Sequence, residues 1–285
     1  MCTAIEHDGC FGRTLDLDVC YPFYVTVTPR QFSFTFSEKS RHAMIGMATV
    51  ANGQPLYYEA ANEHGLGMAA LRFARCAVYH PDTDGTVASF ELIPWVLSQC
   101  ATLQEARERL RGVRISTRAF SPDYPPTPLH WFLADRSGAV AIEPLAEGLR
   151  LCDDPVRVLT NAPPFARQAA HWTKFVNASQ NAEMPNGLPG DWSSLSRFVR
   201  AAFAATHAPT EETDAARVAA LFRLLHTVAV PRGCVKTDKG EYHSTMYTCC
   251  YDTVRQEYHY TTANRPQVHC VPLGDPCGTE LRIYK

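Results

Sequence analysis

The spacing of apolar and polar positions predicts strands over the first third of the chain. The expected strands span residues 24–36, 43–50, 55–60 and 65–73, which are rich in apolar and β-branched side chains. Asn52-Gly53 lies between the second and third of them and favours a tight hairpin turn. We therefore expect an antiparallel arrangement of neighbouring strands in this region.

Helical spacing begins further along the chain. Ser89 is expected to cap a helix that runs through Pro94, and Thr102 to Glu105 form a capping box for a second helix. Three later helices are predicted at 165–176, around 195–203, and at 218–225 with Thr210 as the cap. Loops are expected at 121–128 and 177–191. Further strands are expected at 129–134, 139–143, 149–152, 156–160, 244–251, 258–262 and near Val268.

The order of these elements indicates the fold class. Strands, helices, strands, helices and strands follow one another in blocks, so a doubly wound parallel sheet is disfavoured. Antiparallel sheets packed against helices, an α+β fold, suit this order better. Nothing in the sequence resembles an interdomain linker, and we expect a single domain over residues 1–285.

Composition and charge exclude several classes of protein. The chain has 27 basic and 29 acidic residues, so a nucleic-acid partner bound through a broad basic face is not expected. No apolar run reaches the roughly 18–20 residues that a membrane span needs, and the first residues do not resemble a signal peptide. The eleven cysteines contain no CxxC pair, which favours reduced thiols in a cytoplasmic protein.

Cys2 is the most informative candidate for chemistry. Removal of an initiator methionine is favoured when the next residue is small, and removal would place a thiol and a free α-amine on one carbon atom. Their reference pKa values, about 8.5 and about 7.7–8.0, are close enough for proton exchange near neutral pH. The amine could then serve as the general base for the thiol. A cysteine that stands at position 2 by chance is the alternative.

Three further sites could support such a nucleophile. Arg13 and Asp16 follow Gly12, and on an extended chain they point to opposite faces, so one shared site would need a bend or bulge. Asn161 ends an apolar strand, where its amide could donate to an oxyanion. Arg197 lies between core-type positions of a helix and would need a partner if buried. Each also has a purely structural explanation, as an ion pair, a turn cap or a helix-surface arginine.

Together these segments resemble one family, the choloylglycine hydrolases, which include bile salt hydrolases and penicillin V acylases of the N-terminal nucleophile superfamily. The resemblance runs from end to end. It rests on Cys2-Thr3, FGRTLD at 11–16, NEHGLGMAAL at 62–71, LHWF at 129–132, LTN at 159–161, LPGDWSSLSRFVR at 188–200 and VPRGCVK at 230–236.

This resemblance implies a four-layer αββα sandwich, with two antiparallel sheets between layers of helices. It implies that Cys2 is the nucleophile and that Arg13 and Asp16 support it. Asn161 would help to bind the oxyanion, and Arg197 would complete the catalytic group. No metal or organic cofactor is implied.

Two positions and one loop depart from the family pattern. Arg72 stands where many bile salt hydrolases have Asn, and it could meet an anionic head group or form an ion pair with a sheet neighbour. Leu17 replaces an aromatic residue of some relatives and could reshape the acyl pocket. The loop over 162–187 looks shorter than in tetrameric relatives, so a homo-oligomer is expected but the standard tetramer is not.

The predicted function is hydrolysis of the amide bond in glycine- or taurine-conjugated bile acids, with possible acyl transfer to other amines. The alternative within the family is a penicillin V acylase or another N-acyl amidase, including one that acts on acyl-homoserine lactones. A metal-binding protein is a third hypothesis. It rests on Cys249, Cys250, Cys270 and Cys277 together with the eleven histidines, and their spacing fits no structural zinc pattern.

Overall fold

The structure is a computed structural model that describes residues 1–17, 22–179, 187–236 and 240–285. Within these residues, two large antiparallel sheets contain seven and eight strands. The seven-stranded sheet has the order β12 (Val158–Leu159), β1 (Cys2–His7), β2 (Cys10–Leu17), β14 (Tyr242–Asp252), β15 (Glu257–Thr262) and β16 (Arg265–Pro272), with β13 (Val235–Lys236) beside β14.

The eight-stranded sheet contains most of the strands from the middle of the chain. Its order is β11 (Gly148–Asp153), β10 (Gly138–Leu145), β9 (Leu129–Asp135), β6 (Gly67–Arg72), β5 (Gln54–Asn62), β4 (Met44–Ala51), β3 (Tyr24–Thr28) and β17 (Arg282–Tyr284). A separate parallel pair is formed by β7 (Val87–Ala88) and β8 (Ile115–Ser116).

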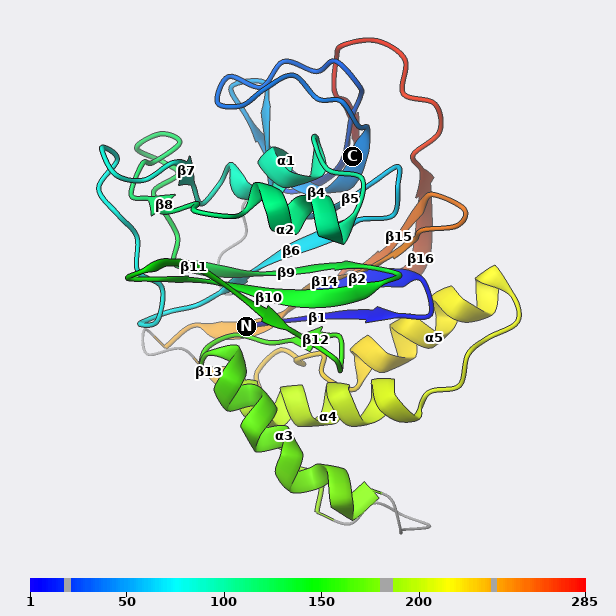
Figure 1. Cartoon of the computed structure of the whole chain (residues 1–285). Helices are drawn as coiled ribbons and strands as arrows, with labels where there is room; N and C mark the ends of the chain where they lie inside the picture. The colour runs from blue at the N-terminus through cyan, green and yellow to red at the C-terminus, as the bar shows by residue number, and fades with distance from the viewer. Residues whose placement is uncertain (18–21, 180–186, 237–239) are drawn as a thin grey trace.

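Helices cover the outer faces of the two sheets. On one side, α1 (Leu92–Leu97) packs against β5 and β6, and α2 (Leu103–Arg109) packs against β9. On the other side, α4 (Ser194–His207) packs against β1, α5 (Asp214–His226) packs against β2 and β14, and α3 (Phe165–Ser179) packs against α4. Figure 1 shows the resulting layers, with both sheets between the two sets of helices. The expected αββα sandwich is confirmed.

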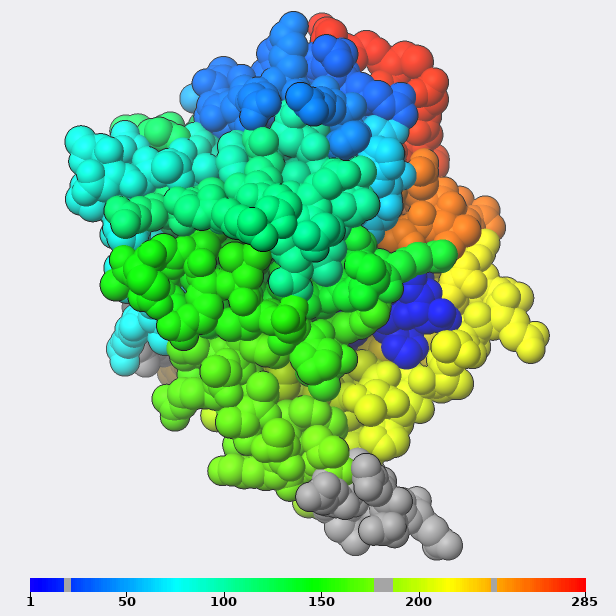
Figure 2. Space-filling model, in the orientation of Figure 1, coloured from blue at the N-terminus to red at the C-terminus, as the bar shows by residue number. Residues whose placement is uncertain are grey.

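Aromatic side chains fill the space between the sheets close to the N-terminal strands. Phe11 of β2 stacks on Phe132 of β9 with ring centroids 6.0 Å apart. A Cβ atom at Gly67 of β6 would lie only 2.5 Å from the ring of Phe11, so a glycine is needed there. On the face drawn in Figure 2, the N-terminal residues reach the surface only as a small dark-blue patch. The first strands are therefore central to the molecule.

The predicted hairpin at Asn52-Gly53 is confirmed. Both residues have positive φ, 50° and 71°, and they join β4 to β5 with Ala51 opposite Gln54. Two residues of positive φ match the right-handed twist of adjacent strands, which is why this dipeptide is informative.

The strand predicted over 24–36 is wrong beyond Thr28. Residues after Thr28 form a loop in which Phe32 and Phe34 are buried and pack edge to face, with centroids 4.9 Å apart. Their alternation with polar residues comes from a loop packed against the core and not from a strand. A loop packed against the core and a strand can both alternate apolar and polar residues, so sequence periodicity alone does not distinguish a loop from a strand here.

Helix caps were predicted with mixed success. Thr102 caps α2 as expected, since its hydroxyl accepts from the Glu105 N–H at 3.2 Å. Ser89 does not cap α1, which begins after Glu91. Thr213 rather than Thr210 caps α5, accepting from the Ala216 N–H. Residues 177–179 of the predicted loop belong to α3, and 180–186 lie outside the described residues.

The cysteines that the structure describes are all unpaired. Cys10 and Cys100 are buried as expected of small apolar residues, whereas Cys76 and Cys152 are half-buried and Cys234 is exposed. Cys20 lies outside the described residues. Among the described helices, none is both long and apolar enough to span a lipid bilayer.

Candidate active site

Cys2 begins β1, which lies between the edge strand β12 and β2 in the seven-stranded sheet. The residue is only 3% exposed, and it lies opposite Leu15 of β2 in the antiparallel ladder. Ala4 and Ile5, further along β1, pair with β12 on the other side. The two neighbouring strands thus fix the position of the Cys2 main chain.

Met1 extends the pairing of β1 and β2 by one residue. Its carbonyl accepts from the Asp16 N–H at 2.8 Å, and its amino group donates to the Asp16 carbonyl. Burial lowers the pKa of the Met1 amino group, and the nearby charges of Cys2 and Asp16 act in the opposite direction. The start of the chain is therefore enclosed among ionisable side chains.

Asn161 contacts the main chain of Cys2 directly. Its Oδ1 accepts from the Cys2 N–H at 2.5 Å and from Arg197 Nη2 at 3.0 Å. Its Nδ2 donates to the Arg72 carbonyl at 3.1 Å. The acceptor end of this amide is fully used, while Nδ2 has a second N–H that can donate to a further oxygen atom.

A polar network behind Asn161 holds its main chain. Its carbonyl accepts from Ser194 Oγ at 2.7 Å and from Gln168 Nε2 at 2.8 Å. Thr160 donates through its hydroxyl to Gln168 Oε1 at 2.8 Å. The sequence reasoning missed Gln168 and Ser194, because their position in two different helices shows no local pattern.

Arg197 reaches Cys2 from the helix side of the sheet. The side chain is fully buried in α4, and its Nη1 donates to the Cys2 carbonyl at 2.6 Å and to Thr3 Oγ1 at 2.7 Å. Burial lowers the pKa of Arg197, with the charges of Asp16 and Cys2 acting against this. The helix-surface alternative for Arg197 is wrong, and its partners are main-chain, hydroxyl and amide oxygens.

Arg13 lies on the other face of the same sheet. Its Nη1 donates to the carbonyls of Tyr58 and Ala70, at 2.9 and 2.8 Å, which belong to the eight-stranded sheet. Glu59 lies 3.7 Å away. Burial acts to lower the pKa of Arg13, but the attraction of Cys2, Tyr247 and Glu59 outweighs it and raises this pKa. The cation therefore lies between the sheets close to Cys2.

Glu59 is the centre of a buried group that the sequence did not reveal. Tyr258 donates to its Oε1 at 2.6 Å, Tyr247 donates to its Oε2, and the Met47 N–H donates at 3.1 Å. Burial raises the pKa of Glu59, while Arg13 and the two phenols act to lower it. This carboxylate and its donors fix the guanidinium of Arg13.

Asp16 faces away from Arg13, as the two-residue period of a strand requires. Its Oδ1 accepts from Thr245 Oγ1 of β14 at 2.6 Å. The bend or bulge after Gly12 that a shared face would need is not present in β2, and the register shift of this ladder lies in β14, between Thr245 and Tyr247. Arg13 and Asp16 thus approach the start of the chain from opposite faces of the sheet.

Arg72 and Leu17 lie at the edge of this group. The Arg72 side chain is exposed at the end of β6, and among the described residues it has no ion-pair partner. The ion pair with a sheet neighbour is therefore not observed. Leu17 ends β2, is half-buried and packs against the core cluster.

Metal-ligating side chains gather elsewhere. In the parts of the chain that the structure describes, two groups have the necessary spacing: His42 with Glu63 and His64, and Glu257 with His259 and Cys270. Neither includes Cys2 or a residue that contacts it. Around Cys2 lie a thiol, a nearby cation and an amide donor, which are the groups that acyl transfer through a nucleophile requires.

Comparison with known proteins agrees with this geometry. The sequence model of one family, described as "Linear amide C-N hydrolases, choloylglycine hydrolase family", matches residues 2–276. A "Bile salt hydrolase/transferase" from Lactiplantibacillus plantarum is 35% identical, over 96% of this chain and 92% of the relative.

Solved structures share the same architecture. The conjugated bile acid hydrolase from Clostridium perfringens superposes with a TM-score of 0.91 at 26% identity, covering 100% of this chain and 97% of that one. The penicillin V acylase from Agrobacterium tumefaciens gives a TM-score of 0.83 at 21% identity, over 99% and 90% of the two chains. The latter likeness is one of fold.

Proposed function

Because the chain belongs to the choloylglycine hydrolase family of linear amide C–N hydrolases, we propose that it cleaves glycine- or taurine-conjugated bile acids. The observation that carries this proposal is the contact of Asn161 with Cys2, Arg197 and Arg72. It joins the buried Cys2, an oriented amide, a buried guanidinium and the main-chain carbonyl of Arg72 in one array.

The proposed reaction begins after removal of Met1, which makes the Cys2 nitrogen a free amine. This amine takes the thiol proton, and the sulfur attacks the carbonyl carbon of the substrate amide. The tetrahedral oxyanion accepts a hydrogen bond from the unused N–H of Asn161 Nδ2. The protonated amine then gives its proton to the leaving nitrogen as the C–N bond breaks.

The second half of the reaction releases the acyl group. Water, deprotonated by the same amine, attacks the thioester carbon. When the C–S bond breaks, the departing thiolate takes that proton back from the amine. A different amine in place of water would yield a new amide. This is the route to the transferase activity that appears in the name of the L. plantarum relative.

Arg197 and Arg13 have separate roles in this scheme. Arg197 fixes Asn161 and the Cys2 carbonyl, so the donor and the nucleophile keep one relative position. Arg13 places a positive charge near Cys2, which stabilises the thiolate by direct attraction. Asp16 places a negative charge on the opposite face of the sheet from Arg13. Its main-chain N–H pairs with the carbonyl of the residue before Cys2 and so holds the start of β1.

Arg72 and Leu17 are proposed to select the substrate. Asn161 contacts the main-chain carbonyl of Arg72, which places the Arg72 main chain close to Cys2 and leaves its side chain exposed at the end of β6. Glycine and taurine both end in an anion that a guanidinium can bind. Leu17 offers an apolar surface to the acyl part.

The test is a substrate panel with the Met1-processed protein. Glycine- and taurine-conjugated bile acids, penicillin V and an acyl-homoserine lactone are compared by kcat/KM, with release of the free amine as the readout. Preference for the bile acid conjugates supports the proposal. Intact conjugates together with cleaved penicillin V or lactone would assign the chain to the alternative amidase activity.

Two further expectations belong to this proposal. The unpaired thiols of the described cysteines support a reducing, cytoplasmic location, which fractionation of the native cells would test. We also propose a homo-oligomer other than the standard tetramer, to be tested by light scattering after gel filtration. A monomer would contradict the second expectation.

A further inference from the structure

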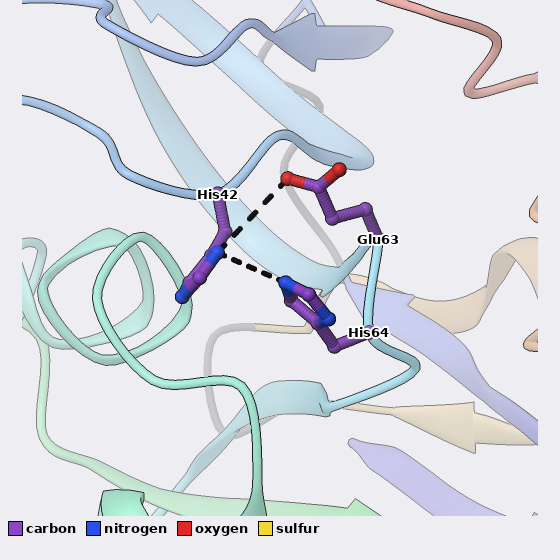
Figure 3. A group of neighbouring side chains, drawn as sticks. All are labelled: His42, Glu63 and His64. Atoms are coloured by element: carbon purple, nitrogen blue, oxygen red, sulfur yellow. Dashed lines mark hydrogen bonds and ion pairs between the residues drawn. The ribbon is translucent and has the colours of Figure 1, made fainter.

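Three metal-ligating side chains converge at the end of β5 (Figure 3). His42 precedes β4, while Glu63 and His64 lie in the turn between β5 and β6. His42 Nδ1 is 3.0 Å from His64 Nε2 and 4.0 Å from Glu63 Oε1. All three ligand atoms lie within 4.8 Å of one another.

This group is separate from the active site. The strand β6 leads from the turn to Arg72, whose carbonyl contacts Asn161. At a rise of about 3.3 Å per residue, the strand between Gly67 and Arg72 spans roughly 17 Å. The cluster therefore lies at the opposite end of the strand from Cys2 and takes no part in the proposed reaction.

Main-chain contacts hold the three ligand residues in place. The Ala43 N–H donates to Glu63 Oε1 at 2.8 Å, and the Glu63 N–H donates to the Ala43 carbonyl at 3.0 Å. Buried Asn62 accepts from the His64 N–H at 3.0 Å, and Gln256 donates to the Glu63 carbonyl at 2.7 Å. Such fixed ligands lose little conformational freedom when they bind an ion.

We propose that His42, Glu63 and His64 bind a divalent transition-metal ion, with zinc the ion that fits best. Two imidazoles and one carboxylate form a common zinc ligand set. With bonds of about 2.0–2.1 Å, tetrahedral ligand atoms lie roughly 3.3–3.4 Å apart. The observed separations of 3.0 and 4.0 Å bracket this value. His64 is exposed, so a water molecule can take the fourth position.

Arg30 competes for this carboxylate through both of its oxygens. Its Nε donates to Glu63 Oε1 at 2.9 Å and its Nη2 donates to Oε2, while its Nη1 lies 3.3 Å from Asp275. Arg30 is 48% exposed and Asp275 is 75% exposed, so the guanidinium can shift toward Asp275 when the ion arrives. The two imidazoles are consequently the essential ligands, and Glu63 is the weaker one.

A bound ion would join the loop before β4 to the β5–β6 turn. Because these ligands come together only in the folded chain, zinc stabilises the fold by mass action, and the melting temperature rises with zinc concentration. This gives a readout that does not depend on turnover at Cys2.

The experiment compares zinc binding by the wild type, His42→Gln, His64→Gln and the control His226→Gln in equilibrium dialysis. His226 is an exposed histidine at the end of α5, outside both metal-ligating groups. Zinc held at Cys2 or near Cys270 is common to all four proteins and cancels in the comparison. We expect His42→Gln and His64→Gln to lose one equivalent of zinc or to bind it over about 100-fold more weakly, because loss of an outer contact alone typically costs about 10- to 100-fold and these residues are direct ligands.

A melting experiment in EDTA confirms that the variants are folded. Zinc should then raise the melting temperature of the wild type and His226→Gln by more than that of His42→Gln and His64→Gln. His64 is exposed, so His64→Gln alone decides the matter if His42→Gln does not fold. Equal zinc content and an equal thermal response in His64→Gln and the wild type would overturn the proposal.

Discussion

Two buried arginines approach Cys2 from opposite faces of one sheet, and their surroundings differ. Arg13 lies between the sheets, with Glu59 at 3.7 Å and two carbonyls of the other sheet as acceptors. Arg197 lies on the helix side and donates to Cys2, Thr3 and Asn161, with no carboxylate within ion-pair distance among the described residues. Their pKa values move in opposite directions, raised for Arg13 and lowered for Arg197.

The difference indicates that one residue type serves two purposes here. Arg13 belongs to a charge group with Glu59, Tyr247 and Tyr258, and it supplies positive potential near the sulfur. Arg197 uses its planar array of donors to set the geometry of oxygens that surround Cys2. Substitutions can therefore separate the electrostatic contribution from the positioning contribution.

The largest effect is expected at the residue that both arginines approach. Cys2→Ser should abolish turnover while leaving the fold intact, because a hydroxyl is far less ionised than a thiol near neutral pH. Arg13 then has no thiolate to stabilise, whereas the contacts of Arg197 with the main-chain carbonyl and with Asn161 remain. Amine release and the melting temperature are measured together, and full activity in the folded variant would remove Cys2 from the mechanism.

The next largest effect is expected on stability at Arg13. Arg13→Met leaves the buried Glu59 without its cation, and loss of one partner of a buried pair typically costs about 3–5 kcal/mol of unfolding free energy. Denaturant unfolding measures this loss. The double variant Arg13→Met with Glu59→Gln should recover part of it. A single variant as stable as the wild type would show that the pair contributes little.

Asn161→Ala should act mainly on kcat. Loss of one oxyanion donor typically lowers kcat by about 10²- to 10³-fold. Arg197→Met disturbs the same array. In a double-mutant cycle, the loss of kcat in the double variant, expressed as a free energy, should therefore be smaller than the sum of the losses in the two single variants. A decrease below threefold for Asn161→Ala would reject the oxyanion role, and full additivity would reject the positioning role of Arg197.

The smallest effect is expected at the exposed edge. Arg72→Ala should raise KM for conjugates with an anionic head group and change it less for neutral N-acyl amides of the same acid. Because Asn161 contacts the main-chain carbonyl of Arg72, the substitution leaves that hydrogen bond in place. Equal changes for both substrate types would assign Arg72 a structural role.

The sequence predicted most of the elements and the residues that meet at Cys2. Local rules worked where the contact is local, as at Asn52-Gly53 and at the Thr102 cap. The two-residue period of β2 also predicted correctly that Arg13 and Asp16 face opposite ways. Arg13 and Asp16 do not share one face of the sheet. They lie on opposite faces, one on each side of the start of the chain.

Contacts between distant segments could not be predicted from the sequence. Glu59 meets Tyr247 and Tyr258 only because the two sheets stack in one register. The bulge near Thr245 is fixed by pairing with β2, and β14 itself has no glycine that would signal it. Thr210 and Thr213 are both followed by acidic residues, so tertiary packing decides which of them caps α5.

Mass spectrometry of the acyl-enzyme tests the central claim most directly. The wild-type protein is mixed with a conjugated bile acid, quenched in acid and digested, and the N-terminal peptide is analysed. The account predicts a peptide that begins at Cys2, without Met1, and carries one bile acyl group, which is absent in Cys2→Ser. An acyl group on another residue, or full turnover by a chain that retains Met1, would contradict it.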